Sequence, residues 1–457
     1  MLTQKIAEFV VDTKEVPAEV LLGATNALID TLGVALVGAT EPISAIARQW
    51  ASALQAKPVA TVWAADFGSS AGEAAFVNGL ASHVLDYDDT SPSLRGHPSA
   101  TLIPTVIAVG ESLHSSGTEA LTAYALGLDV AGKLAKALGN GHYTRGWHNS
   151  ATVGVFSCTA AAGRLLGLNV EQLRTAFGLA ASQSSGLVRN FGTMSKAFHV
   201  GHAARCAIHA AWLAQHGFTA DTSILDGKDS FVATYGGDDG EPLAAMVAKL
   251  GSPWEILKPG IAFKRWPCCY QIHRGIVGLM DLIAQNDIST AEIEAIDIGF
   301  PPGSDAALIY DDPKDGLEGK FSTQYNVAAF VLDRKLDLTS YTEPMIKRPQ
   351  VQALMRKVKY HLVPDTKSYA GTVGYTDVEI ITVRGTFKRR VQQEETRAAW
   401  VVTDDEHDEK FMNCTTPIVG AQRGRALLAL ARKCTSLADV GELARAAAAS
   451  NTAGTME

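Results

Sequence analysis

The sequence predicts a mainly α-helical protein, in which a large all-α helical bundle domain is joined by a smaller α+β lid domain inserted before a C-terminal helical return. Three observations lead to this fold class. Hydrophobic residues make up 47% of the chain and charged residues only 19%, with many alanines, which is typical of helix-rich globular proteins. Apolar residues recur at helical spacing up to about residue 250. Beyond that point β-branched and aromatic residues become more frequent, and helical spacing returns from residue 405.

The first part of the chain is predicted to be helical throughout. The helix at 17–40 carries Val20, Leu28 and Leu36 at helical spacing, and Pro17 occupies a first-turn position where its missing N–H removes no hydrogen bond. A helix with small residues is also expected after Gly154. The other helices expected before residue 260 are 2–12, 43–54, 71–85, 99–113, 117–138, 170–184, 202–216 and 241–250.

The second part is predicted to contain strands. The segment 254–263 is expected to be extended, and a domain boundary is placed near residue 260. The elements expected next are a helix at 268–285, a strand at 293–301, a helix that begins near Tyr325, a helix at 350–357, and strands at 358–363, 374–384 and 387–393. Helices at 405–414, 419–434 and 437–449 would then return to the bundle. The predicted domains are a discontinuous helical domain, 1–260 and 398–457, and an α+β lid domain, 261–397.

Composition and charge exclude several classes of function. The net charge is −8 and no long Lys/Arg block occurs, so no nucleic acid partner is expected. Six scattered cysteines without a Cys-x-x-Cys motif, and the lack of a signal-peptide pattern, favour a cytoplasmic location. Asp30 interrupts the longest early apolar run, so no membrane partner is expected. Without a P-loop, a glycine-rich nucleotide loop or a metal-ligand set, we predict no cofactor and no metal, and chemistry performed by side chains.

Residues 83–101 are the strongest candidate for that chemistry. Asp86, Asp89, Thr90 and His97 leave an apolar helical run and enter a turn rich in Ser, Pro and Gly, where side chains can project into a cavity. Alternatively, the Asp and Thr residues could be helix caps, and His97 could be a structural residue of the turn. An acidic cluster followed by a titratable histidine, without metal-ligand spacing, favours an acid–base site.

Three later segments carry cationic or titratable side chains. His148 lies near a predicted helix start, where it either helps to bind an anion or merely caps the helix. Lys196 and His199 could present two such groups to one ligand, although a surface lysine and a structural histidine are the alternatives. Lys264 and Arg265 place adjacent positive charge before a helix, which suits a dianion.

Residues 83–101 resemble the signature of the MmgE/PrpD family, whose members include 2-methylcitrate dehydratase, cis-aconitate decarboxylase and iminodisuccinate epimerase. The family pattern is roughly His-x-x-Asp-x-Asp-Asp-Thr followed by His-Pro-Ser/Gly, and this chain has His83, Asp86, Asp88, Asp89, Thr90, His97, Pro98 and Ser99. Further motifs resemble the family in the same order, at 146–154, 194–201, 264–273 and 320–325. The last of these reads Lys-Phe-Ser-Thr-Gln-Tyr.

The resemblance covers almost the whole chain and implies a homodimer with a helical bundle, an α+β lid and a helical tail. It implies that Lys264 reaches the substrate, and the other residues that it assigns to the pocket are His148, Lys196, His199 and Tyr325. The turn at 91–95 departs from the strict pattern, and Arg95 could alter what enters beside His97.

The expected pocket contains several cationic side chains and few acidic ones. Such a pocket suits a substrate with two or more carboxylates, which indicates the kind of reaction. Clustered cations also stabilise the enolate-like charge that develops when a proton α to a carboxylate is removed. We therefore expect a cofactor-independent lyase that eliminates water from a small di- or tricarboxylate, as a 2-methylcitrate dehydratase does. Epimerisation of a dicarboxylate such as iminodisuccinate, decarboxylation of cis-aconitate, and a catalytically silent polycarboxylate binder or scaffold stay open.

The expected catalytic residues are His97, Asp86, Tyr325 and Lys196. His97 is the acid or base, Asp86 orients or tunes a neighbouring group, and Tyr325 is a second proton carrier. The residues expected to bind the substrate are Thr90, His148, His199, Lys264 and Arg265.

Overall fold

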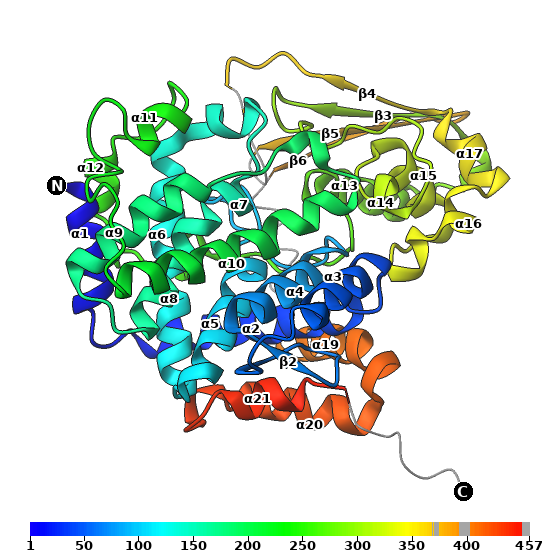
Figure 1. Ribbon diagram of the computed structural model, residues 1–457. Coiled ribbons are helices and arrows are strands. Elements are labelled where there is room, and N and C mark those ends of the chain that lie inside the picture. The colour runs from blue at the N-terminus through cyan, green and yellow to red at the C-terminus, as the bar shows by residue number, and fades with distance from the viewer. Residues whose placement is uncertain (368, 370–373, 393–402, 450–457) are drawn as a thin grey trace, which may run out of the picture.

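The computed structural model describes residues 1–367, 369, 374–392 and 403–449. Helices make up most of the molecule, and a four-stranded sheet lies at the upper right of Figure 1. The mainly α fold class is therefore confirmed.

The helical bundle contains the long helices that the apolar spacing predicts. They are α1 (Leu2–Asp12), α2 (Ala18–Gly38), α3 (Pro42–Ala53), α4 (Ala71–His83), α5 (Ser99–Leu113), α6 (Gly117–Thr144), α8 (Gly154–Leu165), α9 (Val170–Gln183) and α10 (Met194–Gln215). Apolar side chains of α1, α2, α5, α6, α8, α9 and α10 meet in the main hydrophobic core. Short elements between the helices are β1 (Ala60–Thr61), β2 (Gly68–Ser69), α7 (Asn149–Thr152), η1 (Val188–Asn190), α11 (Phe231–Tyr235), α12 (Leu243–Val247) and η2 (Ile256–Gly260).

The start of α10 differs from the prediction, because the helix begins at Met194 rather than at residue 202. The side chain of Thr193 caps the helix. The glycines nearby make this helix start hard to recognise in the sequence. Gly201 lies inside the helix, where a Cβ would be 2.2 Å from a main-chain carbonyl oxygen of α4. Close packing of α10 on α4 therefore requires glycine there, and Lys196 and His199 lie on the first turns of α10.

The extended structure predicted for 254–263 is wrong in part, because Ile256–Gly260 forms the helical turn η2. Asp129 of α6 accepts hydrogen bonds from the main-chain N–H groups of Gly251 (2.8 Å) and Glu255 (2.9 Å). These tertiary contacts fix the backbone just before the turn, and they override the local preference for an extended chain.

The α+β part is built on a sheet with strand order β4-β3-β5-β6. β3 pairs in parallel with β4 and antiparallel with β5, which pairs antiparallel with β6. The strands are β3 (Ile293–Phe300), β4 (Val358–Leu362), β5 (Tyr375–Thr382) and β6 (Gly385–Gln392). The accompanying helices are α13 (Tyr270–Asn286), η3 (Thr290–Glu292), α14 (Gly316–Gly319), α15 (Thr323–Asp333), η4 (Leu338–Tyr341), α16 (Glu343–Ile346) and α17 (Pro349–Met355). α13 packs on β5 and β6, where Gly278 approaches Val378 closely enough to exclude a Cβ.

The C-terminal helices return to the bundle, as predicted, at the bottom of Figure 1. They are α19 (Asp404–Val419), α20 (Ala421–Arg432), η5 (Cys434–Ser436) and α21 (Gly441–Ala446). α19 packs against α2, and Nζ of Lys410 lies 2.6 Å from Oδ1 of the buried Asp30. The domain boundaries stay predictions, and the one at 397–398 lies outside the described residues.

α2 is long and apolar enough, by length and composition, to cross a membrane. In the fold, 72% of its apolar window is buried within the protein, which is the arrangement of a core helix. Its Asp30 is buried against Lys410 of α19.

Candidate active site

The turn after α4 is buried and held in an unusual conformation. Asp86 has a φ of 52°, in the left-handed region that aspartate tolerates better than most residues. Asp89 ties the turn to the start of α5, because its carboxyl group accepts hydrogen bonds from the main-chain N–H and the hydroxyl of Ser99. Burial raises the pKa of Asp89 well above its ordinary value, which favours the uncharged form of this structural group.

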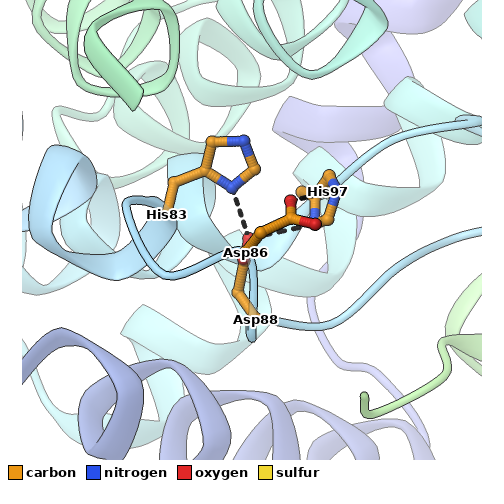
Figure 2. A group of neighbouring side chains, drawn as sticks. All are labelled: His83, Asp86, Asp88 and His97. Carbon is orange, nitrogen blue, oxygen red and sulfur yellow. Dashed lines mark hydrogen bonds and ion pairs between the residues drawn. The ribbon is translucent and has the colours of Figure 1, made fainter. Parts of the chain in front are cut away.

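Four side chains from the end of α4 and this turn form a compact cluster, drawn in Figure 2. Oδ2 of Asp88 lies 2.9 Å from Nδ1 of His83 and 3.1 Å from Nδ1 of His97. The second contact has an ion-pair distance but lacks the alignment of a full hydrogen bond. Nε2 of His97 lies 3.6 Å from Oδ1 of Asp86. Asp88 therefore faces the Nδ1 side of both imidazoles, and Nε2 of His97 lies on the side of Asp86.

Two lysines from distant segments converge on Asp86. Nζ of Lys196, on α10, lies 2.5 Å from Oδ1 of Asp86 and 2.7 Å from Nε2 of His83. Nζ of Lys264 lies 2.7 Å from Oδ2 of Asp86 and 2.8 Å from the main-chain oxygen of the same residue. Burial alone would raise the pKa of Asp86, but Lys196 and Lys264 hold it well below its ordinary value. Asp86 is therefore a carboxylate that anchors two ammonium groups.

The contacts fix the protonation of the two histidines in the cluster. An ammonium group can only donate, so Nε2 of His83 accepts from Lys196, and Nδ1 carries the proton that faces Asp88. Burial lowers the pKa of His83 to about 3. Burial also lowers the pKa of His97 below its ordinary value of 6.5, against the opposing effect of Asp88. At neutral pH His97 is an uncharged imidazole, and a proton on Nδ1 toward Asp88 leaves Nε2 free to accept one.

His148 and His199 form a second imidazole pair, with their Nδ1 atoms 3.1 Å apart. Burial lowers the pKa of His148 well below its ordinary value and that of His199 to about 4. Both rings are therefore neutral, and one Nδ1 donates to the other. His148 lines the cavity described next, whereas His199 does not line it and contacts the Nδ1 side of the His148 ring.

A cavity of about 40 Å³ lies between the bundle and the α+β part. The chemically capable residues that line it from the bundle are Asp86, Thr90, Arg95, His97, Tyr143, His148 and Lys196. The α+β part contributes Cys269, Gln271, Ala307 and Phe321, among others. The structure therefore brings together side chains from segments that lie far apart in the sequence.

Several polar atoms on the cavity wall have no hydrogen-bond partner within the described part of the chain, namely Oγ1 of Thr90, Nε of Arg95 and Nε2 of Gln271. The main-chain N–H of Ala307 donates to Oε1 of Gln271 (2.8 Å), which identifies Nε2 as the free donor. Arg95 donates one guanidinium N–H to the carbonyl oxygen of Ala135 (3.1 Å). Because unpaired buried donors are costly, this wall favours a ligand with acceptor oxygens.

Three residues of this arrangement were not among the predicted site residues. Asp88 is part of the sequence signature, but nothing in the local pattern shows that it faces His97. Arg95 belongs to the divergent turn at 91–95, has a φ of 56° and lines the cavity. Gln271 lies in the first turn of α13 within the 264–273 motif, and no sequence signal distinguishes it.

Tyr325 and Arg265 do not line the cavity, and Lys264, expected to reach the substrate, is connected to it only through its contacts with Asp86. Tyr325 is fully buried in α15, and its hydroxyl donates to the main-chain oxygen of Ser340. Burial also raises the pKa of this phenol. Arg265 is exposed, with its guanidinium 5.7 Å from the ring centre of Trp266. The geometry gives no support to the roles expected for these two residues, and we assign them none.

The cluster in Figure 2 also has the spacing of a metal site, with ligand atoms within 4.8 Å of one another. However, both oxygens of Asp86 accept from lysine ammonium groups, and Nε2 of His83 accepts from Lys196. The ammonium groups of Lys196 and Lys264 balance the two carboxylates of the cluster. A metal ion would have to displace them, so this donor set does not fit a metal.

Comparisons with known proteins identify the family of this chain. The model of the MmgE/PrpD N-terminal domain matches residues 4–242, and the model of the MmgE/PrpD C-terminal domain matches residues 266–435. The chain is 30% identical to a cis-aconitate decarboxylase of Homo sapiens over 349 residues, which cover 74% of this chain and 71% of that protein. It is 28% identical to the cis-aconitate decarboxylase of Mus musculus over 379 residues, 79% of this chain and 75% of that protein. A cis-aconitate decarboxylase of Aspergillus terreus is 26% identical over 370 residues, 76% of this chain and 75% of that protein.

Proposed function

This chain belongs to the MmgE/PrpD family, and on that premise we propose that it is a cofactor-independent lyase that acts on a small di- or tricarboxylate. The observation that carries the proposal is a neutral His97 and the ammonium group of Lys196 at the wall of one cavity, with the ammonium group of Lys264 held by the same carboxylate, Asp86, as Lys196. A neutral imidazole next to two cations suits a reaction that passes through a carbanion-like state.

Each group has a defined task in such a reaction. Nε2 of His97 removes or delivers a proton at the substrate carbon that is α to a carboxylate. Asp88 holds the opposite side of the ring. The charge that develops on the substrate is stabilised by Lys196, which already lies at the cavity wall. Asp86 keeps Lys196 and Lys264 in place before the substrate arrives, so little reorganisation is needed.

The rest of the cavity wall supports a substrate with more than one carboxylate. Arg95 and Gln271 offer free N–H donors, and Thr90 offers a free hydroxyl. His148 adds a neutral hydrogen-bonding group beside them. A carboxylate away from the reacting carbon would satisfy these donors and orient the substrate over His97.

Two lyase reactions fit this machinery. In decarboxylation a C–C bond breaks, carbon dioxide leaves, and the electron pair left on the carbon forms a C–H bond with a proton that His97 takes up from solvent and delivers. In dehydration a proton passes from carbon to His97, a C=C bond forms, and hydroxide leaves as water after it is protonated. The similarity to cis-aconitate decarboxylases supports the first reaction, with cis-aconitate as the first substrate to test. Dehydration of a 2-methylcitrate-like acid, the reaction expected from the sequence, is the second.

Proton NMR in deuterated buffer tests the proposal without added cofactor. The purified protein is incubated with cis-aconitate, 2-methylcitrate, citrate and iminodisuccinate in turn, with and without a chelator. We expect new signals of a decarboxylated product from cis-aconitate, or new vinylic signals from the hydroxy acids. Deuterium uptake with loss of stereochemistry would indicate epimerisation instead.

The variant His97→Gln is the matched control, because it retains a polar side chain of similar size. If this variant still converts the substrate, His97 is not the group that carries the proton. No change in any of the acids would contradict the lyase proposal and favour a silent polycarboxylate binder. The homodimer and the cytoplasmic location also remain proposals, and light scattering after gel filtration tests the first.

A further inference from the structure

Three consecutive carbonyl oxygens of the Asp86 turn each accept a hydrogen bond from a lysine of another segment. Nζ of Lys320 lies 2.8 Å from the carbonyl oxygen of Leu85. Nζ of Lys264 lies 2.8 Å from that of Asp86, and Nζ of Lys410 lies 2.8 Å from that of Tyr87. Of these three lysines, Lys264 is the one that also contacts the carboxylate of Asp86.

Lys320 and Lys410 each reach a second carbonyl oxygen, and both of these belong to the segment 264–267. Lys320 donates to the carbonyl oxygen of Pro267 (2.8 Å), and Lys410 donates to that of Lys264 (3.1 Å). The two ammonium groups therefore fasten the turn to this segment at both ends. Lys320 lies just after α14 and Lys410 lies on α19, so three separate parts of the fold meet here.

The turn needs such support because Asp86 has left-handed backbone angles, which are unfavourable for a residue with a Cβ. The carboxylate of Asp86 in turn holds Lys196 and Lys264. A shift of the turn of less than 1 Å would be enough to change these ion pairs, since hydrogen-bond distances span only a few tenths of an ångström.

We propose that Lys320 and Lys410 are positioning residues that fasten the Asp86 turn to the segment 264–267 and so set the contacts that Lys264 and Asp86 make around His97. This inference rests on the proposed function for its catalytic meaning. Neither lysine lines the cavity, so neither touches the substrate. Their effect passes through Asp86 and Lys264.

The surroundings of the two lysines agree with this role. Lys320 is buried, its ammonium group lies 4.2 Å from the ring centre of Tyr341, and it has no salt bridge to a carboxylate among the residues described. Lys410 is neutralised by Asp30 at 2.6 Å and lies 4.0 Å from the ring centre of Tyr87. The ammonium group of Lys320 is therefore placed for its hydrogen bonds to two carbonyl oxygens, whereas Lys410 combines its two hydrogen bonds with an ion pair.

The titration of His97 in the substrate-free protein tests the proposal directly. Histidine-selective labelling allows the ring of His97 to be followed by NMR against pH, and the spectrum of His97→Gln identifies its signal among the 12 histidines. In wild type the ammonium groups of Lys264 and Lys196 help to lower the pKa of His97. When Lys320→Met or Lys410→Met releases the turn, Lys264 moves away and the pKa of His97 rises measurably toward its ordinary value.

Two controls keep the test decisive. Lys133→Met removes another buried lysine, one that contacts neither the turn nor the cavity, and it should lower the melting temperature without moving the pKa of His97. Lys320→Gln, which keeps a donor, serves if Lys320→Met does not fold, and it should give a smaller shift. An unchanged His97 titration in folded variants of Lys320 and Lys410 would overturn the proposal.

Activity gives an independent readout. On any substrate that the wild type converts, the variants of Lys320 and Lys410 should lose at least tenfold in kcat with a smaller change in KM. Unchanged kcat would also contradict the positioning role. If the wild type converts none of the acids, the proposed function fails, while the titration of His97 still decides whether the two lysines set the turn.

Discussion

Oδ2 of Asp88 lies 3.1 Å from Nδ1 of His97, on the side of the ring away from Asp86. The same oxygen lies 2.9 Å from Nδ1 of His83. Because Lys196 donates to Nε2 of His83, the proton of that ring faces Asp88 and is not available to the cavity. The arrangement leaves His97 as the ring in this cluster that can exchange a proton with a substrate.

Replacing Asp88 with Asn should reduce kcat by about a hundredfold or more, on the scale of lost acid–base catalysis. The amide no longer favours the proton on Nδ1 of His97, so a fraction of the enzyme holds the wrong tautomer. Steady-state kinetics on the substrate found by NMR measure the loss. Asp89→Asn is the matched control, since burial already favours the uncharged form of Asp89 and the amide can replace it. Equal activity in both variants would contradict a role for Asp88.

Replacing His97 with Gln should cut turnover by about a hundredfold or more while the fold is kept. Gln is similar in length but does not titrate, so it can hold a hydrogen bond but cannot carry the proton. Circular dichroism and the melting temperature show whether the fold is kept. Retained turnover would mean that another group on the cavity wall, such as His148, moves the proton.

The sequence predicts the long helices well, because apolar spacing, proline starts and side-chain caps are local signals. It fails where distant contacts decide, as at η2, whose backbone is fixed by Asp129 of α6, and at the start of α10, where Gly201 is a packing residue instead of a boundary. The same division holds for the candidate site. Asp86 and His97 belong to one short motif, whereas the placement of Gln271 depends on how α13 meets the bundle.

The pH dependence of kcat/KM should show one ionisation below pH 6.5, because burial lowers the pKa of His97 in the free enzyme below that ordinary value. If His97 removes a proton from carbon, activity is lost as the pH falls through this pKa, since the ring becomes charged. If His97 donates a proton after decarboxylation, activity instead falls as the pH rises through the same pKa. Rate profiles for wild type and for the residual activity of His97→Gln decide, and an ionisation that persists in the variant belongs to another group.

Replacing Arg95 with Leu should raise KM about tenfold or more, with a smaller change in kcat. A hydrogen bond to a charged group contributes about 1.5–3 kcal/mol, and Arg95 offers a free donor at the cavity wall. The effect should be largest for acids with an extra carboxylate, so a series of di- and tricarboxylates measures it. Arg145→Leu is the control, because Arg145 is exposed and donates to the carbonyl oxygen of Gly236. Equal KM values for wild type, Arg95→Leu and Arg145→Leu would show that Arg95 does not bind the extra carboxylate.

Replacing Lys133 with Met should destabilise the protein by about 3 kcal/mol, because it leaves the buried Asp129 without an ammonium partner and Glu255 with Lys136 alone. Nζ of Lys133 lies 2.6 Å from Glu255 and 3.6 Å from Asp129, and all three side chains are buried. Burial already raises the pKa of Asp129, with Lys133 opposing it, so the variant should bind a proton more readily than wild type.

Melting temperatures at two pH values test both parts of this argument. The variant should melt well below wild type at pH about 7.5, and the gap should narrow toward pH about 5, because a carboxyl group with a raised pKa binds its proton first in the folded state, which relieves the penalty as the pH falls through that pKa. Lys136→Met is the matched control: its side chain is 27% exposed and it contacts the same oxygen of Glu255 at 2.7 Å, so its loss should cost less. A gap that is equal for both lysines, or that widens at low pH, would show that the buried charge of Asp129 and Glu255 is not the source of the instability.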